Sequence, residues 1–194
     1  MWPFVRNLPP AKSPSKADLE AARGRLLPDV LPPPGASLRV LLCGINPSLY
    51  SAAAGHHFAR PGNRFWPALH LSGFTPRLLS PSEQQQLTGY GLGITNVASR
   101  PTAQASELTA TELRDGGARL ISLAERRGPR FVAIAGVTAY RIAFGRPHAM
   151  IGPQDETVGP ARLWILPNPS GLNASWTLSR LVQAFGELKA AAGD

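Results

Sequence analysis

The chain has 194 residues, of which 43% are hydrophobic, and this length and composition suit one globular domain with a buried core. Its 20 basic residues against 12 acidic ones give a net charge of +8, which favours a polyanionic partner such as nucleic acid; a solvated basic surface without a partner is the alternative. A single cysteine excludes a disulfide framework, and no apolar run is long enough to span a membrane. Because the first residues also lack the apolar stretch of a signal peptide, we expect a cytoplasmic protein, associated with the nucleoid in a bacterium.

Residues 1–36 are predicted to form a partly flexible arm, rich in proline and basic residues, ahead of a single domain over residues 37–194. Proline runs occur at residues 9–10 and 32–34, and residues 15–23 between them predict a short capped helix. The arm could add phosphate contacts or be a passive extension, and the sequence favours neither.

The rest of the chain alternates strand and helix signals. Apolar runs predict strands over residues 39–44, 93–97, 131–135 and 161–166, with a long loop through residues 55–63. Helical spacing predicts helices over residues 64–71, 81–87, 111–126, 138–144 and 175–191, the second with a capping box between Ser80 and Glu83. This alternation predicts an α/β protein with three layers, α/β/α, around a central, mostly parallel sheet of four or five strands.

Two of the predicted strands end in the same Asn-Pro-Ser turn. The first turn is Asn46-Pro47-Ser48 and the second is Asn168-Pro169-Ser170. Because proline cannot continue a central strand, each asparagine is held where its strand ends, which is where open α/β sheets place their sites. The pair of turns therefore predicts an active site with two walls.

The chemistry available at these strand ends is neutral. No cluster of His, Cys, Asp and Glu has metal-ligand spacing, and the adjacent His56 and His57 point apart on an extended loop. Most carboxylates fall on predicted helix surfaces, and the glycines of residues 89–93 precede a strand, so they do not form a phosphate-binding loop. Amides, backbone N–H groups and one aromatic suit a reaction whose leaving group departs almost unaided, while the enzyme holds a water and stabilises separated charge.

Several motifs, taken together and in order, resemble the mismatch-specific uracil-DNA glycosylases, a branch of the uracil-DNA glycosylase superfamily that also holds the thymine-DNA glycosylases. They lie at residues 44–47, 58–66, 93–95, 99–102, 112–117 and 168–172, and the likeness runs from about residue 37 to about residue 190. The resemblance implies a monofunctional hydrolase that flips uracil, especially opposite guanine, and related damaged bases out of double-stranded DNA and starts base excision repair. It implies a monomer, without cofactor or metal, whose partner is DNA with G·U or G·T mismatches.

The resemblance also implies roles for residues of the first turn. Asn46 would hold the hydrolytic water against C1′ of the flipped nucleotide; a simple turn cap is the structural alternative. Because an amide orients water but hardly deprotonates it, slow turnover is expected. The base pocket would be formed by Ile45, Ser48, Phe58 and Asn168, with Phe58 stacked on the base instead of packed in the core.

The second turn would carry the DNA wedge. Leu172 would fill the gap left by the flipped base, while Gly171 and Asn173 lie against the opposite strand; a buried leucine is the alternative. Implied phosphate contacts, some of which could instead be structural ion pairs, are Ser170, Arg60, Arg64 and Arg100.

Four positions depart from the family pattern or bear on its selectivity. Ser48 stands where many relatives have glycine, Asn96 where a bacterial relative has lysine, and Ala174 where an arginine is expected, while Ser51 lies near the position that sets selectivity against the thymine methyl. They leave two further hypotheses open. One is a glycosylase of the same superfamily whose main lesion is hypoxanthine, xanthine or ethenocytosine, and the other is a catalytically inert mismatch-binding relative.

Overall fold

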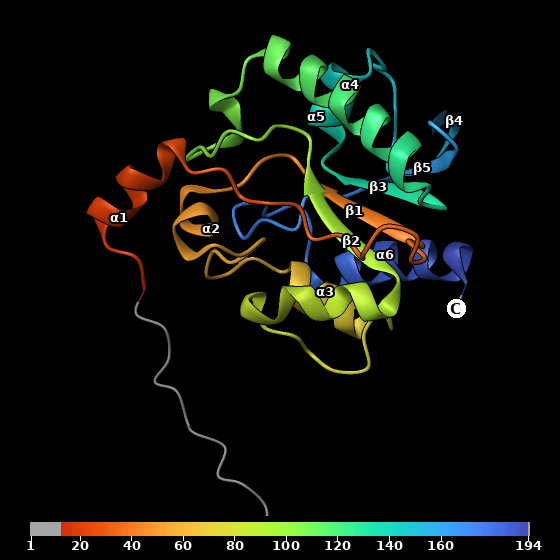
Figure 1. Ribbon diagram of the computed structural model, residues 1–194, viewed down its shortest axis with the longest axis horizontal. Coiled ribbons are helices and arrows are strands. Elements are labelled where there is room, and N and C mark those ends of the chain that lie inside the picture. Colours follow the sequence, from red (N-terminus) through yellow and green to blue (C-terminus); the bar gives the residue numbers. More distant parts are fainter. Residues whose placement is uncertain (1–12, 194) are drawn as a thin grey trace, which may run out of the picture.

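The structure, a computed structural model, describes residues 13–193, so the proline pair at residues 9–10 of the predicted arm lies outside the described residues. Within the described part, one sheet of five strands has the order β2-β1-β3-β5-β4 (Figure 1). The strands are β1 (Val40–Gly44), β2 (Leu92–Asn96), β3 (Phe131–Ala135), β4 (Gly152–Val158) and β5 (Ala161–Leu166). Four of them are parallel, and β4 pairs with β5 antiparallel, which confirms the predicted fold class.

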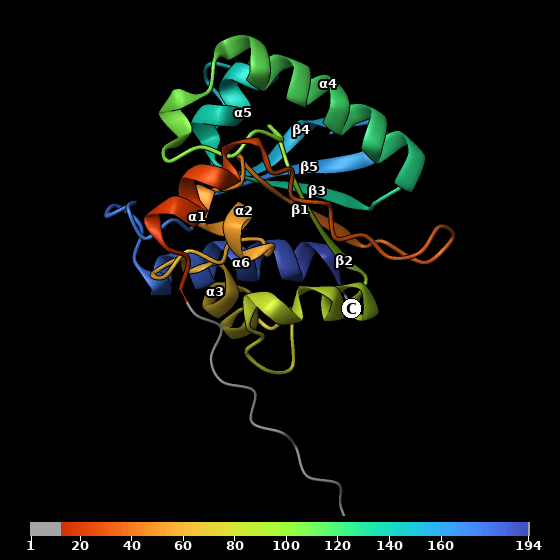
Figure 2. The ribbon, with the colours of Figure 1, turned by 60° about the vertical axis from the view of Figure 1, so that its left-hand side comes forward.

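The sheet is covered on both faces, as Figure 2 shows. Leu41 and Cys43 of β1 pack into the core under α4 (Ala110–Arg127) and α5 (Val137–Ala143). Leu42 packs into the opposite core, against α3 (Phe65–Leu71), α6 (Leu178–Ala192) and the 3-10 helix η2 (Pro81–Tyr90). Every residue of β1, β2 and β3 is buried, as expected of parallel strands between two helical layers.

The structure corrects several sequence-based boundaries. Strand β4 was not predicted, because its exposed positions are polar and Pro153 argues against a central strand; as an edge strand it tolerates both. Residues 81–87 are 3-10 and not α-helical, although the Ser80–Glu83 capping box is present. Two short helices, α2 (Leu49–Ala54) and η3 (Ala105–Glu107), were missed, and α6 begins at Leu178, three residues after the predicted start.

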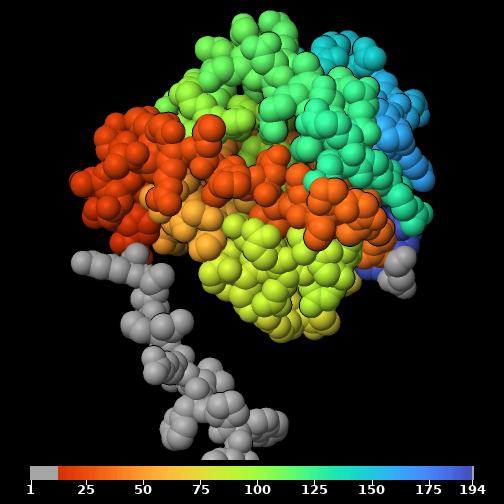
Figure 3. All heavy atoms as spheres, viewed as in Figure 1, coloured from red at the N-terminus to blue at the C-terminus, as the bar shows by residue number. Residues whose placement is uncertain are grey.

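The stretch before β1 is attached to the domain. The predicted short helix is present as α1 (Lys16–Ala21), followed by the 3-10 turn η1 (Ala22–Gly24). Further on, Val30 is buried and exchanges two backbone hydrogen bonds of 2.8 Å with Ile94 of β2. The side chain of Asp29 accepts a hydrogen bond of 2.7 Å from Thr95 and lies 3.6 Å from Arg119 of α4. Figure 3 shows this stretch as a continuous red-to-orange band across the surface, while the boundary at residue 36 stays a prediction.

The carboxyl ends of the parallel strands all lie at one edge of the sheet. Because β3 separates β1 from β5, the turns that follow β1 and β5 lie on either side of the end of β3. The loop after β2 lies beside the first turn, and its backbone is joined to it by the bond from Ala98 N–H to the carbonyl of Ile45, 2.8 Å long. The sheet topology therefore brings three loops together that are far apart in the sequence.

Gly116 of α4 allows the close approach of this helix to the loop after β2. A Cβ at Gly116 would lie 2.2 Å from the carbonyl oxygen of Val97, whereas a Cβ at Gly186 of α6 would meet no described residue within 4 Å beyond its neighbours and the backbone of its own helix. We expect Gly116→Ala to lower the free energy of unfolding by about 1–3 kcal/mol, because the helix has to move. Gly186→Ala is the control and is expected to raise it by about 0.5–1 kcal/mol. Urea unfolding of both variants measures the difference, and equal effects would contradict the close approach.

Candidate active site

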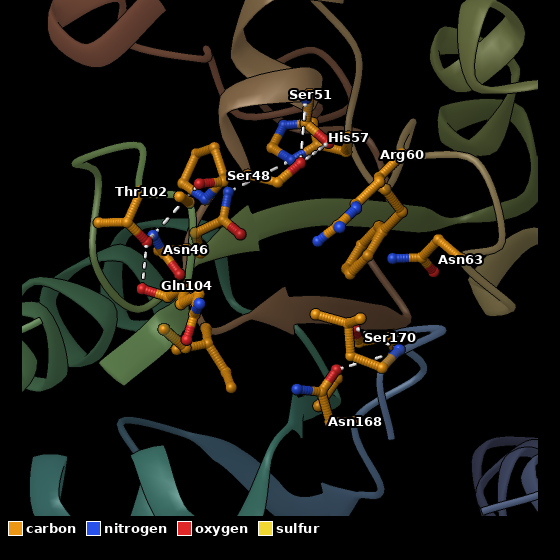
Figure 4. A pocket seen from close by; sticks show the side chains of 18 of the residues that line it. Asn46, Ser48, Ser51, His57, Arg60, Asn63, Thr102, Gln104, Asn168 and Ser170 are labelled. Atoms are coloured by element: carbon orange, nitrogen blue, oxygen red, sulfur yellow. Dashed lines mark hydrogen bonds between the residues drawn. The ribbon is translucent and has the colours of Figure 1, made fainter. Parts of the chain in front are cut away.

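A cavity of about 340 Å³ opens at the carboxyl edge of the sheet. Its lining comes from the turns after β1 and β5, the loop after β2 and the loop over residues 55–63. Figure 4 shows Asn46 on one wall and Asn168 with Ser170 on the facing wall. Both Asn-Pro-Ser turns therefore line one cavity, with the two walls that the sequence predicted. The residues of the predicted site that line it are Ile45, Asn46, Ser48, Phe58, Arg60, Asn168, Ser170, Leu172 and Asn173.

The amide nitrogen of Asn46 is held by the protein. It donates to the hydroxyl of Thr102 at 2.7 Å, to the carbonyl of Arg100 at 2.9 Å and, more weakly, to the carbonyl of Pro47 at 3.2 Å. The Thr102 hydroxyl donates its own proton to the carbonyl of Gln104 at 2.8 Å, so its oxygen can only accept from Asn46. Because both amide protons are used, the oxygen Oδ1 is the group of Asn46 left for the cavity. That oxygen can accept a hydrogen bond from a water molecule.

Ser48, the first departure from the family pattern, is used to cap α2. Its hydroxyl accepts from the backbone N–H of Ser51 at 3.1 Å and donates to the Ser51 hydroxyl at 3.1 Å. The Ser51 hydroxyl in turn accepts from the backbone N–H of Ala59 at 3.1 Å. The two serines therefore join the first turn to the loop that carries Phe58. The side chain of Ile45 packs over Gly136, which follows β3. Ile45 is half-buried and forms part of the cavity wall.

Phe58 is backed by a second aromatic ring. Its ring stacks on the buried Phe65, with 3.9 Å between centroids and 13° between planes, which leaves the other face of the Phe58 ring without this partner. Among the described residues that are not glycine, Phe58 alone has a positive φ, of 52°, and such a backbone is strained for a bulky side chain. Gly44 is required beside it, because a Cβ there would lie 3.2 Å from the Phe58 ring and 2.5 Å from Oδ1 of Asn96. The ring is thus half-buried and lines the cavity.

Asn96 and His57 belong to the site although the sequence interpretation gave neither a role in it. Asn96 ends β2, is 5% exposed and lines the cavity. Its Nδ2 donates to Nδ1 of His57 at 3.3 Å, and Nε2 of His57 lies 2.9 Å from the carbonyl oxygen of Pro28. One sequence signal could have found Asn96: like Asn46, it is an asparagine at the carboxyl end of a buried strand.

The second turn is held by its own side chains. Oδ1 of Asn168 accepts from the backbone N–H of Ser170 at 3.0 Å, and Nδ2 of Asn173 donates to the carbonyl of Asn168 at 3.0 Å. Gly171 touches the other loop, since a Cβ there would lie 2.6 Å from the carbonyl oxygen of Gly62. Leu172, which follows, is 68% exposed, so the alternative of a buried leucine is wrong.

The predicted phosphate-binding arginines differ in what they contact. Arg60 is exposed at the cavity and makes no hydrogen bond or ion pair with the residues that the structure describes. Arg100 pairs with Glu112, 2.5 Å from Nε to Oε1, and this guanidinium, together with the backbone N–H of Thr109, lowers the pKa of Glu112 to about 2. Arg64 donates to the backbone carbonyls of Ser170, Asn173 and Trp176. Arg100 thus makes the structural ion pair that was the alternative, while Arg64 bonds backbone carbonyls; a phosphate contact of either residue stays a prediction.

The comparisons with known proteins agree with this fold. A family model described as the uracil DNA glycosylase superfamily matches residues 32–189, and the chain therefore belongs to this superfamily of DNA glycosylases, hydrolases that act on DNA. A solution NMR structure of a candidate uracil DNA glycosylase from Methanosarcina acetivorans is similar, with a TM-score of 0.56 and 21% identity. The likeness covers 84% of this chain and 97% of that one, and at this identity it shows the fold alone. The family assignment is coarser than the branch that the motifs resemble.

Residues 13–193 also bear on other classes of protein. In this part of the chain, no group of at least three His, Cys, Asp or Glu side chains is placed to hold a metal ion. In the same residues, no helix is both long and apolar enough to cross a membrane.

Arg64 is expected to stabilise the fold where Arg60 does not. Arg64→Met removes the donors to three backbone carbonyls, and we expect it to lower the free energy of unfolding by about 1.5–3 kcal/mol. Arg60→Met removes an exposed charge and is expected to change it by less than about 0.5 kcal/mol. Urea unfolding in the absence of DNA measures both. A small effect of Arg64→Met would contradict the stabilising role of these bonds.

His57 is expected to lower stability in acid. Burial is the main cause that lowers the pKa of His57, so the unfolded chain binds a proton at higher pH than the folded chain does. The free energy of unfolding should therefore be highest above the unfolded pKa of about 6.5 and fall below it by up to about 1.4 kcal/mol per pH unit. Urea unfolding of wild type and of the non-titrating His57→Asn between about pH 5 and pH 8 gives the two slopes. Identical slopes would show that His57 is protonated equally in both states.

Proposed function

We propose that this protein removes uracil, chiefly opposite guanine, from double-stranded DNA by hydrolysing the N-glycosidic bond of a flipped nucleotide, as the first step of base excision repair. The observation that carries the proposal is the orientation of Asn46, whose amide nitrogen is held by the protein while its oxygen is left for the cavity. Action as a monomer in the cytoplasm, on nucleoid DNA in a bacterium, is part of the proposal.

The reaction needs a held water and little else. Oδ1 of Asn46 accepts a hydrogen bond from a water and keeps it against C1′ of the deoxyribose. As the bond from C1′ to N1 of uracil breaks, its electron pair leaves with the base; the water oxygen bonds to C1′ and its proton passes to solvent, from which the uracil anion is later protonated. The uracil anion spreads its charge over two carbonyl oxygens, where amides and backbone N–H groups stabilise it. Because the amide of Asn46 takes no proton, this mechanism implies slow turnover.

The base pocket suits a flipped pyrimidine. The face of Phe58 that does not stack on Phe65 can stack on the base, since an aromatic ring backed by a second ring is rigid. Asn96 lies next to this ring and presents a side-chain amide, which can hydrogen-bond the edge of the base that normally pairs. The amide nitrogen of Asn168 is free to contact the base from the facing wall, because its oxygen is used within the turn.

Leu172 is suited to be the wedge. It is exposed at the cavity rim, on a loop that Arg64 ties to the domain. A leucine that fills the gap in the stack offsets an unstacking cost of a few kcal/mol, which is lower at a mismatch such as U·G. The exposed Arg60 and the net charge of +8 favour attraction of the DNA backbone.

A second candidate is a glycosylase of the same superfamily with another main lesion. The observation that favours it is Asn96, because an amide oxygen accepts a hydrogen bond from any base with a ring N–H beside a carbonyl. Hypoxanthine and xanthine carry this arrangement as well as uracil does. The mismatch-specific branch is therefore a proposal, and turnover on a panel of lesions decides between the two.

Asn46 and Thr102 are expected to control the chemical step. On a duplex with one U·G pair, Asn46→Ala should lower the single-turnover rate of base release by about 10²–10⁴-fold, because the water is no longer held. Thr102→Val should lower it by about tenfold, because the Asn46 amide loses its shortest hydrogen bond. Thr111→Val, on the exposed surface of α4, is the matched control and should match wild type. Strand cleavage by alkali at abasic sites measures all four proteins.

The outcomes separate the hypotheses. An active Asn46→Ala would show that another residue holds the water. Wild type that releases hypoxanthine or xanthine but no uracil would favour the second candidate. Wild type that binds mismatched DNA and releases no base at all would identify an inert relative.

A further inference from the structure

The side-chain amide of Asn96 could in principle face the cavity with either its oxygen or its nitrogen. The two choices have opposite chemistry, since the oxygen accepts a hydrogen bond from the base and the NH₂ group donates one. In the structure Nδ2 lies toward His57 and Oδ1 lies over Gly44, next to the Phe58 ring. What holds the amide in this orientation therefore decides which bases the proposed pocket can accept.

The carbonyl of Pro28 determines the tautomer of His57. A backbone carbonyl only accepts, so Nε2 of His57, 2.9 Å from it, must carry the proton. A neutral imidazole has one N–H, and Nδ1 is therefore the acceptor that faces Asn96. Since Nδ1 can only accept, Asn96 must turn its NH₂ group toward it. The chain of hydrogen bonds leaves one orientation of the amide.

The imidazole of His57 cannot easily move or change its charge. His57 is 2% exposed, its backbone N–H donates to Gln84 at 2.8 Å, and its carbonyl accepts from Trp66 at 3.2 Å. Of the charged and titratable groups around it, the Asp29 carboxylate favours protonation and His56 opposes it, while burial outweighs both and lowers the pKa. The ring therefore stays neutral near pH 7, with Nδ1 free of a proton.

We propose that His57 is a specificity-determining positioning residue: it holds Asn96 with the amide oxygen toward the base, so that the pocket accepts uracil and rejects cytosine. Uracil has a proton on N3, which the amide oxygen accepts. Cytosine has a bare N3, which would place two acceptors against each other with no hydrogen bond between them. The inference rests on the proposed function and extends it, because it names the residue that fixes the orientation of the Asn96 amide.

The stretch before β1 contributes to this arrangement. Pro28 is fixed in place by the two residues that follow it. The side chain of Asp29 accepts a hydrogen bond from Thr95, which precedes Asn96, and Val30 pairs with Ile94, one residue further back along β2. Part of the predicted arm thus takes part in base selection through Pro28 and His57.

The test measures binding of two duplexes that differ in one base. Each carries a 2′-fluorinated deoxyuridine or deoxycytidine opposite thymine, because neither base pairs properly with thymine and the fluorine keeps the glycosidic bond from breaking. Fluorescence anisotropy gives the Kd of each duplex for wild type, His57→Leu, His57→Asn and His56→Leu. Wild type should bind the uracil duplex at least about tenfold more tightly than the cytosine duplex.

The preference for the uracil duplex should depend on whether the variant keeps a hydrogen-bond acceptor at the position of Nδ1 of His57. His57→Leu lacks the acceptor, so the ratio of its Kd for the cytosine duplex to its Kd for the uracil duplex should fall by about tenfold. His57→Asn can place an amide oxygen where Nδ1 lies and should keep most of it. His56→Leu changes the neighbouring histidine, which has no bond to Asn96, and should match wild type. His57→Met, which also lacks the acceptor, replaces His57→Leu if thermal melting shows that the leucine variant does not fold.

Each outcome is decisive. A folded His57→Leu or His57→Met that keeps the full preference overturns the inference, and so does one that loses affinity for both duplexes equally, since that is a purely structural effect. Wild type that prefers the uracil duplex, together with an apolar variant that does not, supports it. Wild type that binds neither duplex better than an unmodified one overturns the proposed function, and this inference with it.

Discussion

The site depends on three asparagine side-chain amides, in each of which either the nitrogen or the oxygen is hydrogen-bonded within the protein. Thr102 and two carbonyls hold the nitrogen of Asn46, His57 holds the nitrogen of Asn96, and the Ser170 N–H holds the oxygen of Asn168. An amide carries no net charge and no useful acidity, so its chemistry lies in which end it presents. By using up the other end, the protein turns three flexible polar groups into fixed donors and acceptors around one cavity. A reaction whose leaving group needs little help suits such a site.

The turn that carries Leu172 is joined to the end of the loop over residues 55–63 and to the start of α3. Arg64 is the N-cap residue of α3, yet its guanidinium lies against carbonyls of the loop that carries Leu172, and its backbone N–H donates to the carbonyl of Pro169 at 3.0 Å. Gly171 and Gly62 touch at a distance that excludes a side chain. The exposed leucine is thus presented by a loop with little freedom. A wedge of this kind loses less conformational entropy when it enters DNA than a mobile one would.

Much of the fold could be predicted from local patterns. The four parallel strands are mostly apolar, and the burial of all their residues except Arg162 follows from that pattern. The capping residues Ser15 and Ser80 marked helix starts because capping is a local interaction. Strand β4 could not be found in this way, since its pattern is polar and only the free edge of β5 makes it a strand. Helix α2 cannot be found in this way either, because the Asn-Pro-Ser turn predicts the start of a loop, whereas Ser48 caps a helix.

The sequence by itself determined where two of the three asparagines of the site lie, Asn46 and Asn168, because the proline after each of them ends a strand at that residue. It also indicated one aromatic and one leucine near them. Only the tertiary structure decided which end of each amide faces the cavity, that Arg64 and Arg100 bond within the protein, and that Pro28 acts on Asn96 through His57. The physical reason is that hydrogen-bond partners far apart in the chain are chosen by how the elements pack. Local sequence patterns predict elements, but they carry no information on those partners.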